Sequence, residues 1–365
     1  MFDFLEDNSK LIPSAEKHIE GLYRLKDTFS GCSGEGFIQR YIDAFSMTGS
    51  PFVVNLDLNA SEYAGDLDRM LEASEAITEK MLETTKATAR HVSGYKMNEQ
   101  SMLTFLLGGK PRTVERIKEL YADETGVEPL VWTDEKLRDI PSTTFQTASI
   151  IYTLGYDAIH CMPQLGPDVA GALQLAAQRM GKGTVHVINM THPGYRHVKE
   201  KYFKDPAGTV ELMREEAMGL ETTVDIGKGK IPVRVRATGT IEPANRPDEL
   251  FLSTGTYGDG IMIISIGIGP QGALPGSALY AGAHIEGIGR FIFERESSFE
   301  TPENMARKAG ACKRSCLKAL GARYSKEPAP YPLGDILSEL QEFDPQISAE
   351  TRRGLDIICE ARKNG

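Results

Sequence analysis

The sequence lacks the features of a membrane, secreted or nucleic-acid-binding protein. No stretch approaches the roughly 18 apolar residues that a membrane-spanning helix needs. The first residues, Met1 to Asp7, are acidic and lack the basic start of a signal peptide. Lys and Arg number 41 against 51 Asp and Glu, and the net charge of −10 disfavours a general nucleic-acid binder. We therefore expect a cytoplasmic protein that binds neither membranes nor nucleic acid.

Cysteine is also scarce. The five cysteines are irregularly spaced, at Cys32, Cys161, Cys312, Cys316 and Cys359. Cys312 and Cys316 are four residues apart and would share one face of a helix. An odd, irregular set favours reduced structural thiols over a disulfide framework, a redox pair or a metal site.

Between residues 51 and 325 the sequence alternates between strand-like and helical patterns. Short apolar runs predict eight strands, at 52–57, 91–97, 129–133, 156–161, 184–189, 233–237, 261–265 and 284–287. Helical spacing predicts helices at 61–90, 111–125, 143–155, 166–180, 198–219, 246–256 and 303–322. Eight such units predict an α/β fold, a (β/α)8 TIM barrel. An open doubly wound sheet is the alternative, but residues 57–60 lack the glycines expected after its first strand.

Three regions exceed a minimal barrel. We expect residues 1–50 to form an N-terminal helical extension, 51–325 the catalytic barrel and 326–365 a C-terminal helical extension. Residues 221–232 contain Gly227-Lys228-Gly229-Lys230, which predicts an exposed turn or hairpin. We expect these additions to serve packing, an interface or a lid rather than catalysis.

Charged side chains recur at the ends of three consecutive predicted strands. Asp57 ends the first strand, Lys96 the second, and Asp134 and Lys136 the third. Alternation along an extended chain places Asp134 and Lys136 on one side. Each residue alone has a plainer interpretation, a turn or helix cap for an aspartate and a solvated charge for a lysine. Barrel enzymes hold active groups at the C-terminal ends of their strands, so the shared placement favours one site.

Two glycine-rich loops follow the last two predicted strands. They read Gly267-Ile268-Gly269-Pro270-Gln271-Gly272 and Gly287-Ile288-Gly289-Arg290. Glycines let backbone N–H groups turn toward an anion, and Gln271 and Arg290 add side-chain donors. Either Gly-x-Gly alone indicates only a turn. Together, in the loops with which many barrels bind phosphate, they predict a phosphate site.

A further loop follows the fifth predicted strand and reads Met190-Thr191-His192-Pro193-Gly194-Tyr195. Pro-Gly predicts a turn, and the Thr191 hydroxyl can donate to a ligand. His192 has the chemistry of a general base. A loop histidine beside a helix is more often structural or exposed, and we favour that interpretation.

These segments together resemble orotidine 5′-monophosphate decarboxylase, in particular the short microbial form of that family. The family signature Asp-x-Lys-x-x-Asp-Ile-Pro-x-Thr matches Asp134 to Thr143 throughout. The segments around Asp57, Lys96 and Thr191, and both glycine loops, are similar to further family motifs. The resemblance spans about residues 51–325.

The resemblance implies a barrel homodimer that converts orotidine 5′-monophosphate to uridine 5′-monophosphate without a metal or a cofactor. It implies a catalytic tetrad of alternating charge, with Lys136 as proton donor: Lys96, Asp134, Lys136 and Asp139. Asp139 and Thr143 would reach the neighbouring subunit's site. The other implied substrate-binding residues are Asp57 at the ribose, Thr191 near the pyrimidine, and Gly269, Gln271, Gly289 and Arg290 at the phosphate.

Two other functions stay open. A magnesium-dependent decarboxylase or aldolase of the same superfamily acts on a sugar phosphate and has a similar Asp-x-Lys-x-x-Asp motif, but it needs an additional acidic ligand. A non-catalytic nucleotide-binding relative would keep the pocket without the chemistry. Lys96 and the Ile140-Pro141-x-Thr143 continuation favour the cofactor-free decarboxylase over the first, and the intact charged set favours it over the second.

Overall fold

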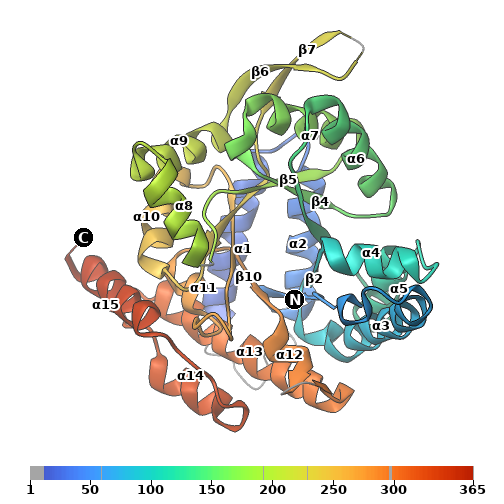
Figure 1. Ribbon diagram of the computed structural model, residues 1–365. Coiled ribbons are helices and arrows are strands. Elements are labelled where there is room, and N and C mark those ends of the chain that lie inside the picture. The colour runs from blue at the N-terminus through green and yellow to red at the C-terminus, as the bar shows by residue number, and fades with distance from the viewer. Residues whose placement is uncertain (1–11, 59, 192, 228, 296–297, 365) are drawn as a thin grey trace.

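A closed barrel of eight parallel strands forms the centre of the molecule (Figure 1). The computed structural model describes residues 12–364 apart from 59, 192, 228, 296 and 297. In spatial order the strands are β1 (Phe52–Asn55), β10 (Ile285–Ile288), β9 (Met262–Ile266), β8 (Gly239–Pro243), β5 (Gly183–Val187), β4 (Ala158–Cys161), β3 (Leu130–Leu137) and β2 (Gly94–Asn98). β1 pairs with both β10 and β2, which closes the ring and confirms the predicted TIM barrel.

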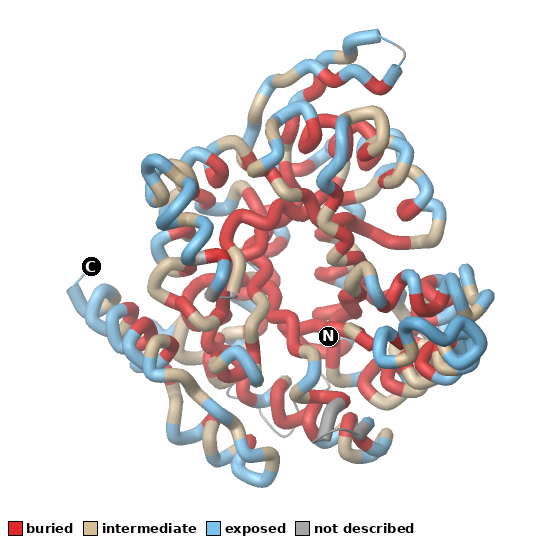
Figure 2. Tube along the Cα trace, in the orientation of Figure 1, coloured by how far each residue is buried: buried red, intermediate tan, exposed pale blue. Residues whose placement is uncertain are grey.

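The barrel strands are short apolar runs because helices or barrel interior cover both of their faces. Figure 2 shows the ring of strands as almost entirely buried. Parallel neighbours in register share a face, so the pairing of Trp132 with Lys96 and with Ala158 places these three side chains on one side of the sheet. That side is the interior, where polar groups must find partners among themselves.

Helices surround the ring. They are α3 (Leu67–Thr88), α4 (Glu99–Leu107), α5 (Thr113–Thr125), α6 (Pro141–Thr153), α7 (Pro167–Met180), α8 (Pro193–Tyr202), α9 (Pro206–Met218), α10 (Pro247–Tyr257), α11 (Ser277–Ala281), α12 (Arg290–Phe293) and α13 (Pro302–Arg323). Side-chain caps fix several starts: Asp66 accepts from the N3 amide of α3, and Thr301 does so for α13. Proline stands at the first position of α6, where no N–H is needed.

In the part of the chain that the structure describes, two helices precede the barrel and close its N-terminal end. They are α1 (Ile12–Asp27) and α2 (Glu35–Thr48). The Tyr41 hydroxyl of α2 donates to the carbonyl of His284, just before β10, at 2.8 Å. The Phe37 ring packs edge-on against Trp132 with centroids 6.1 Å apart. The open end of the barrel is therefore the C-terminal end, where the charged residues lie.

Two further helices follow the barrel, α14 (Leu333–Leu340) and α15 (Ala349–Asn364), joined through the short helix η5 (Gln341–Phe343). They appear in red in Figure 1, against α13 and the α10–α11 side of the barrel. Smaller elements are η2 (Ser61–Tyr63), η3 (Ala89–His91), η4 (Pro163–Leu165), β11 (Glu294–Arg295) and β12 (Ser298–Phe299). Among the described helices, none is both long and apolar enough to cross a membrane.

The sixth barrel strand was predicted at the wrong place. Residues 233–237 are not a barrel strand: β7 (Lys230–Val235) pairs antiparallel with β6 (Leu220–Asp225) in a hairpin that projects from the barrel (Figure 1). The true sixth strand is β8, whose glycine, glutamate and proline hide the strand pattern. Its Glu242 is fully buried because Arg214 of α9 pairs with it at 3.0 Å. The predicted hairpin at 221–232 is confirmed.

Several helices differ from the prediction. The helix predicted at 198–219 is two helices, α8 and α9, because Pro206 starts a new one. The helix predicted at 61–90 is confined to Leu67–Thr88, the one predicted from 143 begins at Pro141, and α4, α11 and α12 were not predicted. The five cysteines are all free, as the irregular spacing indicated.

Candidate functional site

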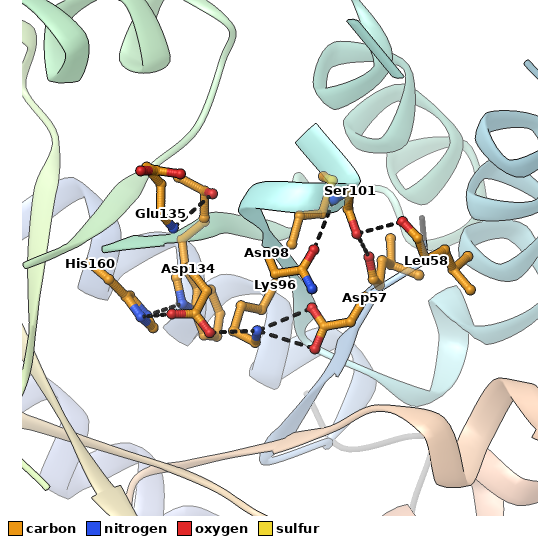
Figure 3. Close-up of polar contacts among 12 residues, drawn as sticks. Asp57, Leu58, Lys96, Asn98, Ser101, Asp134, Glu135 and His160 are labelled. Carbon is orange, nitrogen blue, oxygen red and sulfur yellow. Dashed lines mark hydrogen bonds and ion pairs between the residues drawn. The ribbon is translucent and has the colours of Figure 1, made fainter. Parts of the chain in front are cut away.

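Three of the predicted charged residues, Asp57, Lys96 and Asp134, meet at the C-terminal mouth of the barrel (Figure 3). Lys96 comes from β2 and is 2% exposed. Its Nζ lies 3.2 Å from Asp57 Oδ1, two residues beyond β1, and 3.2 Å from Asp134 Oδ2 on β3. The ammonium thus bridges two carboxylates from the strands on either side. Burial alone would lower the pKa of Lys96, but Asp134 and Asp57 outweigh it and raise the pKa above its ordinary value.

Lys136 approaches the other oxygen of the same carboxylate. Its Nζ lies 2.6 Å from Asp134 Oδ1, and its side chain is 36% exposed, whereas Asp134 is 10% exposed. Burial would raise the pKa of Asp134, but the surrounding Lys96, His160 and Lys136 hold it well below its usual range. Asp134 is therefore a carboxylate anion between two ammonium groups, one enclosed and one open to the mouth.

Asp139 does not join this group within one chain. It is exposed in the loop before α6, and its Oδ1 accepts from the backbone N–H of Ile140 at 2.7 Å. Thr143 lies half-buried in the first turn of α6. Of the expected tetrad, the chain itself brings together Lys96, Asp134 and Lys136.

Sequence reasoning assigned no role to His160, which lies directly behind Asp134. His160 Nδ1 is 2.6 Å from Asp134 Oδ1, and the indole Nε1 of Trp132 donates to His160 Nε2 at 3.0 Å. An indole N–H can only donate, so Nε2 must accept and the imidazole proton sits on Nδ1, donating to Asp134. Burial lowers the pKa of His160 despite the opposing effect of Asp134, which keeps the ring neutral. The alternation of side chains along β4 could have identified His160, because it lies two residues after Ala158 and so faces the barrel interior as Ala158 does.

Asp57 is held by a second residue without a predicted role, Ser101. The Ser101 hydroxyl lies 2.7 Å from the carbonyl of Leu56 and 2.8 Å from that of Leu58, on either side of Asp57. Ser101 sits in the first turn of α4, where Asn98 caps the helix by accepting from its N–H. The turn that carries Asp57 is thus fixed to α4.

The glycine loops lie at the same mouth, on β9 and β10. Gly267, Gly269 and Gly272 all have left-handed φ values, between 86° and 109°, which glycine adopts without strain. A Cβ on Gly267 would lie 3.0 Å from Gln271 Oε1 and 3.1 Å from Thr191 Cγ2. The side chains of Gln271 and Thr191, both predicted site residues, therefore lie against the same glycine. The structure therefore brings Thr191 and Gln271 together.

The second glycine loop contacts the first. A Cβ on Gly269 would lie 3.1 Å from Phe291 Cβ, and one on Gly289 would lie 3.3 Å from Asn55 Cβ at the end of β1. Arg290 is exposed at the start of α12, beside this contact. His192 lies outside the described residues. Both glycine loops thus follow barrel strands at the end where Lys96 and Asp134 lie.

The charged set can perform proton-transfer chemistry on an anionic substrate. Lys136 is a half-buried ammonium that a more deeply buried carboxylate orients toward the mouth, and Lys96 offsets the charge of that carboxylate. Asp57 and Asp134 already share one resident cation, the Lys96 ammonium. Among the described residues, no group of three or more His, Cys, Asp or Glu side chains has the arrangement of a metal site.

Comparison with known proteins agrees with this geometry. A family model described as "Orotidine 5'-phosphate decarboxylase / HUMPS family" matches residues 50–300. The orotidine 5′-phosphate decarboxylase of Methanosarcina mazei is 29% identical over 46% of this chain and 66% of that enzyme. The enzyme of the same name from Thermococcus kodakarensis is 29% identical over 59% of this chain and 84% of that enzyme.

A solved structure shows the same fold. It is an orotidine 5′-monophosphate decarboxylase from Methanocaldococcus jannaschii in complex with the inhibitor BMP, with a TM-score of 0.51. Its sequence is 19% identical, and the alignment covers 72% of this chain and 99% of that one. Since the family model matches more than half of this sequence, including all eight barrel strands but not the last barrel helix α13, the chain belongs to the orotidine 5′-phosphate decarboxylase / HUMPS family.

Proposed function

We propose that this protein decarboxylates orotidine 5′-monophosphate to uridine 5′-monophosphate. The observation that carries the proposal is the Lys96–Asp134–Lys136 arrangement at the barrel mouth, with Lys96 buried and Lys136 partly open to solvent, in a chain of this family. The relatives of about 29% identity bear the name of this activity. The substrate is a dianionic phosphate joined to a carboxylated pyrimidine, and the mouth offers separate places for both ends.

The phosphate end would lie at the two glycine loops. Gly269 and Gly289 supply backbone turns, and Gln271 and Arg290 supply donors. The ribose would lie between these loops and the Asp57–Lys96 pair. Thr191, which meets Gln271 over Gly267, is then near the pyrimidine. Binding energy from the phosphate can hold the reacting end against an unfavourable charge arrangement.

At the reacting end, the substrate carboxylate on C6 would face Asp134. The C6–carboxylate bond breaks, CO2 leaves, and the electron pair stays on C6. Lys136, oriented by Asp134 at 2.6 Å, stabilises the developing carbanion with its positive charge and then transfers an Nζ proton to C6. Solvent can restore that proton because the Lys136 side chain is 36% exposed. The atoms of both products come from the substrate, apart from one proton, which comes from an ammonium group that exchanges protons with water.

We also propose that the working unit is a homodimer in which Asp139 and Thr143 enter the neighbouring site. Asp139 is exposed, and its carboxylate accepts from the backbone N–H of the next residue, Ile140. The adjoining Ile140 is 62% exposed, and Leu103 and Leu107 on α4 are 47% and 43% exposed. Exposed apolar side chains around a catalytic mouth favour a contact with another protein surface.

The test is turnover of orotidine 5′-monophosphate, followed by absorbance, with purified protein treated with a chelator. We expect full activity after chelation and loss of turnover by orders of magnitude in Lys136→Ala, with uridine 5′-monophosphate binding retained. Inhibition by the chelator would instead support the magnesium-dependent sugar-phosphate function. Unchanged turnover in Lys136→Ala would remove Lys136 as the proton donor.

A further inference from the structure

The C-terminal extension contacts the phosphate loops directly. Residues 342–351, which run from η5 to the first turn of α15, lie against the loop after β9. The backbone N–H of Ser348 donates to the carbonyl of Gly272 at 2.9 Å. A Cβ on Gly272 would lie only 2.7 Å from Ser348 Cβ, so the two backbones approach as closely as a glycine allows.

The same segment reaches the loop after β8. The Thr351 hydroxyl is fully buried and donates to the carbonyl of Asn245 at 3.2 Å. The Asn245 amide in turn donates to the carbonyl of Thr191 at 3.3 Å. Ser348 caps this end of α15, because its Oγ accepts from the N–H of Thr351. The first turn of α15 is thus linked through Asn245 to Thr191.

A third contact reaches the loop after β10. The Phe343 ring packs edge-on against Phe291, with centroids 6.4 Å apart and planes at 85°. Phe291 follows Arg290 in α12 and lies against Gly269. Glu342, next to Phe343, pairs with Arg307 of α13 and so anchors this corner of the extension.

We propose that residues 342–351 position the phosphate-binding loops for the phosphate group of the substrate, an inference that rests on the proposed function. The loops are rich in glycine and have high intrinsic freedom, so their donors need support from outside to keep one geometry. The segment contacts the loops that carry Gln271 and Arg290 directly, and it reaches Thr191 indirectly through Asn245. Residues 342–351 lie outside residues 50–300, the region that the family model matches. The support therefore comes from a part of this chain beyond the matched region.

The double variant Phe343→Leu/Thr351→Val tests this. It removes the ring contact and the buried hydroxyl donor while keeping apolar volume, and leaves every residue of the mouth in place. We expect kcat/KM for orotidine 5′-monophosphate to fall roughly tenfold, the combined size of one hydrogen bond and one aromatic pair. Turnover of orotidine, which has no phosphate, should fall by less, because it can lose only the effect that passes through Asn245 to Thr191 near the pyrimidine, whereas the phosphate contacts do not act on it.

The matched control is Arg362→Met, at the other end of α15. Arg362 stacks over the Tyr280 ring at 4.4 Å and donates to the Tyr280 carbonyl at 2.6 Å, on α11 and away from the phosphate loops. We expect this variant to leave the ratio of the two substrates unchanged. Equal losses on both substrates in the double variant, or no loss on either, would overturn the inference.

The two proposals can fail separately. If the wild-type protein does not turn over orotidine 5′-monophosphate, the proposed function fails, and calorimetry with uridine 5′-monophosphate and uridine decides the inference. A weaker affinity of the double variant for the phosphorylated nucleoside alone would support the positioning role. An unchanged affinity, or an equal loss for both, would overturn it.

Discussion

Replacing His160 tests whether the neutral imidazole positions the central carboxylate. His160→Leu removes one of three donors to Asp134 and leaves the Trp132 indole N–H without its acceptor. A hydrogen bond to a charged group contributes about 1.5–3 kcal/mol. If that contribution appears in the transition state, kcat falls by about 10- to 160-fold. Because His160 touches Asp134 and not the phosphate loops, the affinity for uridine 5′-monophosphate should change little.

Two controls separate positioning from general damage. His160→Gln keeps an N–H donor on this side of Asp134 and should recover part of the lost kcat. His186, on the next strand, is equally buried but faces away from the mouth, and burial lowers its pKa to about 4. His186→Leu should therefore lower stability without a specific loss of kcat.

The assay combines kcat and KM for orotidine 5′-monophosphate with 15N NMR of the imidazoles. We expect His160 to hold its proton on Nδ1 and to be neutral at neutral pH, because burial lowers its pKa and an Nε2 proton would oppose the Trp132 N–H. An imidazolium at neutral pH would refute the tautomer argument. An unchanged kcat in His160→Leu would refute the positioning role.

Three further outcomes follow from the site. Arg290→Met should raise KM for orotidine 5′-monophosphate by about 10-fold or more, because a charged hydrogen bond to the phosphate is lost. The KM for orotidine, which has no phosphate, should not change. Equal effects on both substrates would contradict a phosphate role. Mixing inactive Lys136→Ala and Asp139→Ala subunits should restore activity, because a mixed dimer has one site with both residues intact; failure to complement would count against the shared site. The folded-state pKa of Asp134 is lowered, so its contribution to stability is present above the unfolded pKa of about 3.9 and is lost as pH falls through that value toward the folded pKa. Chemical unfolding between pH 2.5 and 6 should show that acid loss, and Asp134→Asn should flatten it.

Local pattern determined the barrel and most of the charged site. Strands that are buried on both faces have apolar sequences, which made the barrel predictable. Parallel strands in a barrel bring their C-terminal ends to one rim. The sequence alone therefore placed four charged residues together: Asp57, Lys96, Asp134 and Lys136. The two-residue period of β3 was enough to put Asp134 and Lys136 on one side, and Nζ and Oδ1 lie 2.6 Å apart. These inferences needed only the geometry of a few neighbouring residues.

Contacts between distant segments decided the rest. The sixth strand was missed because Glu242 is a plausible core residue only once Arg214, 28 positions away in sequence, is known to pair with it. His160 became part of the site because Trp132 fixes its proton and Asp134 accepts it, and neither contact has a local sequence pattern. The meeting of Ser348 with Gly272 depends on how the C-terminal helices pack. The sequence by itself placed Asp57, Lys96, Asp134 and Lys136 at one end of the barrel, whereas only the tertiary structure decided which partners orient them, since a pairing partner is set by folding in space and not by spacing along the chain.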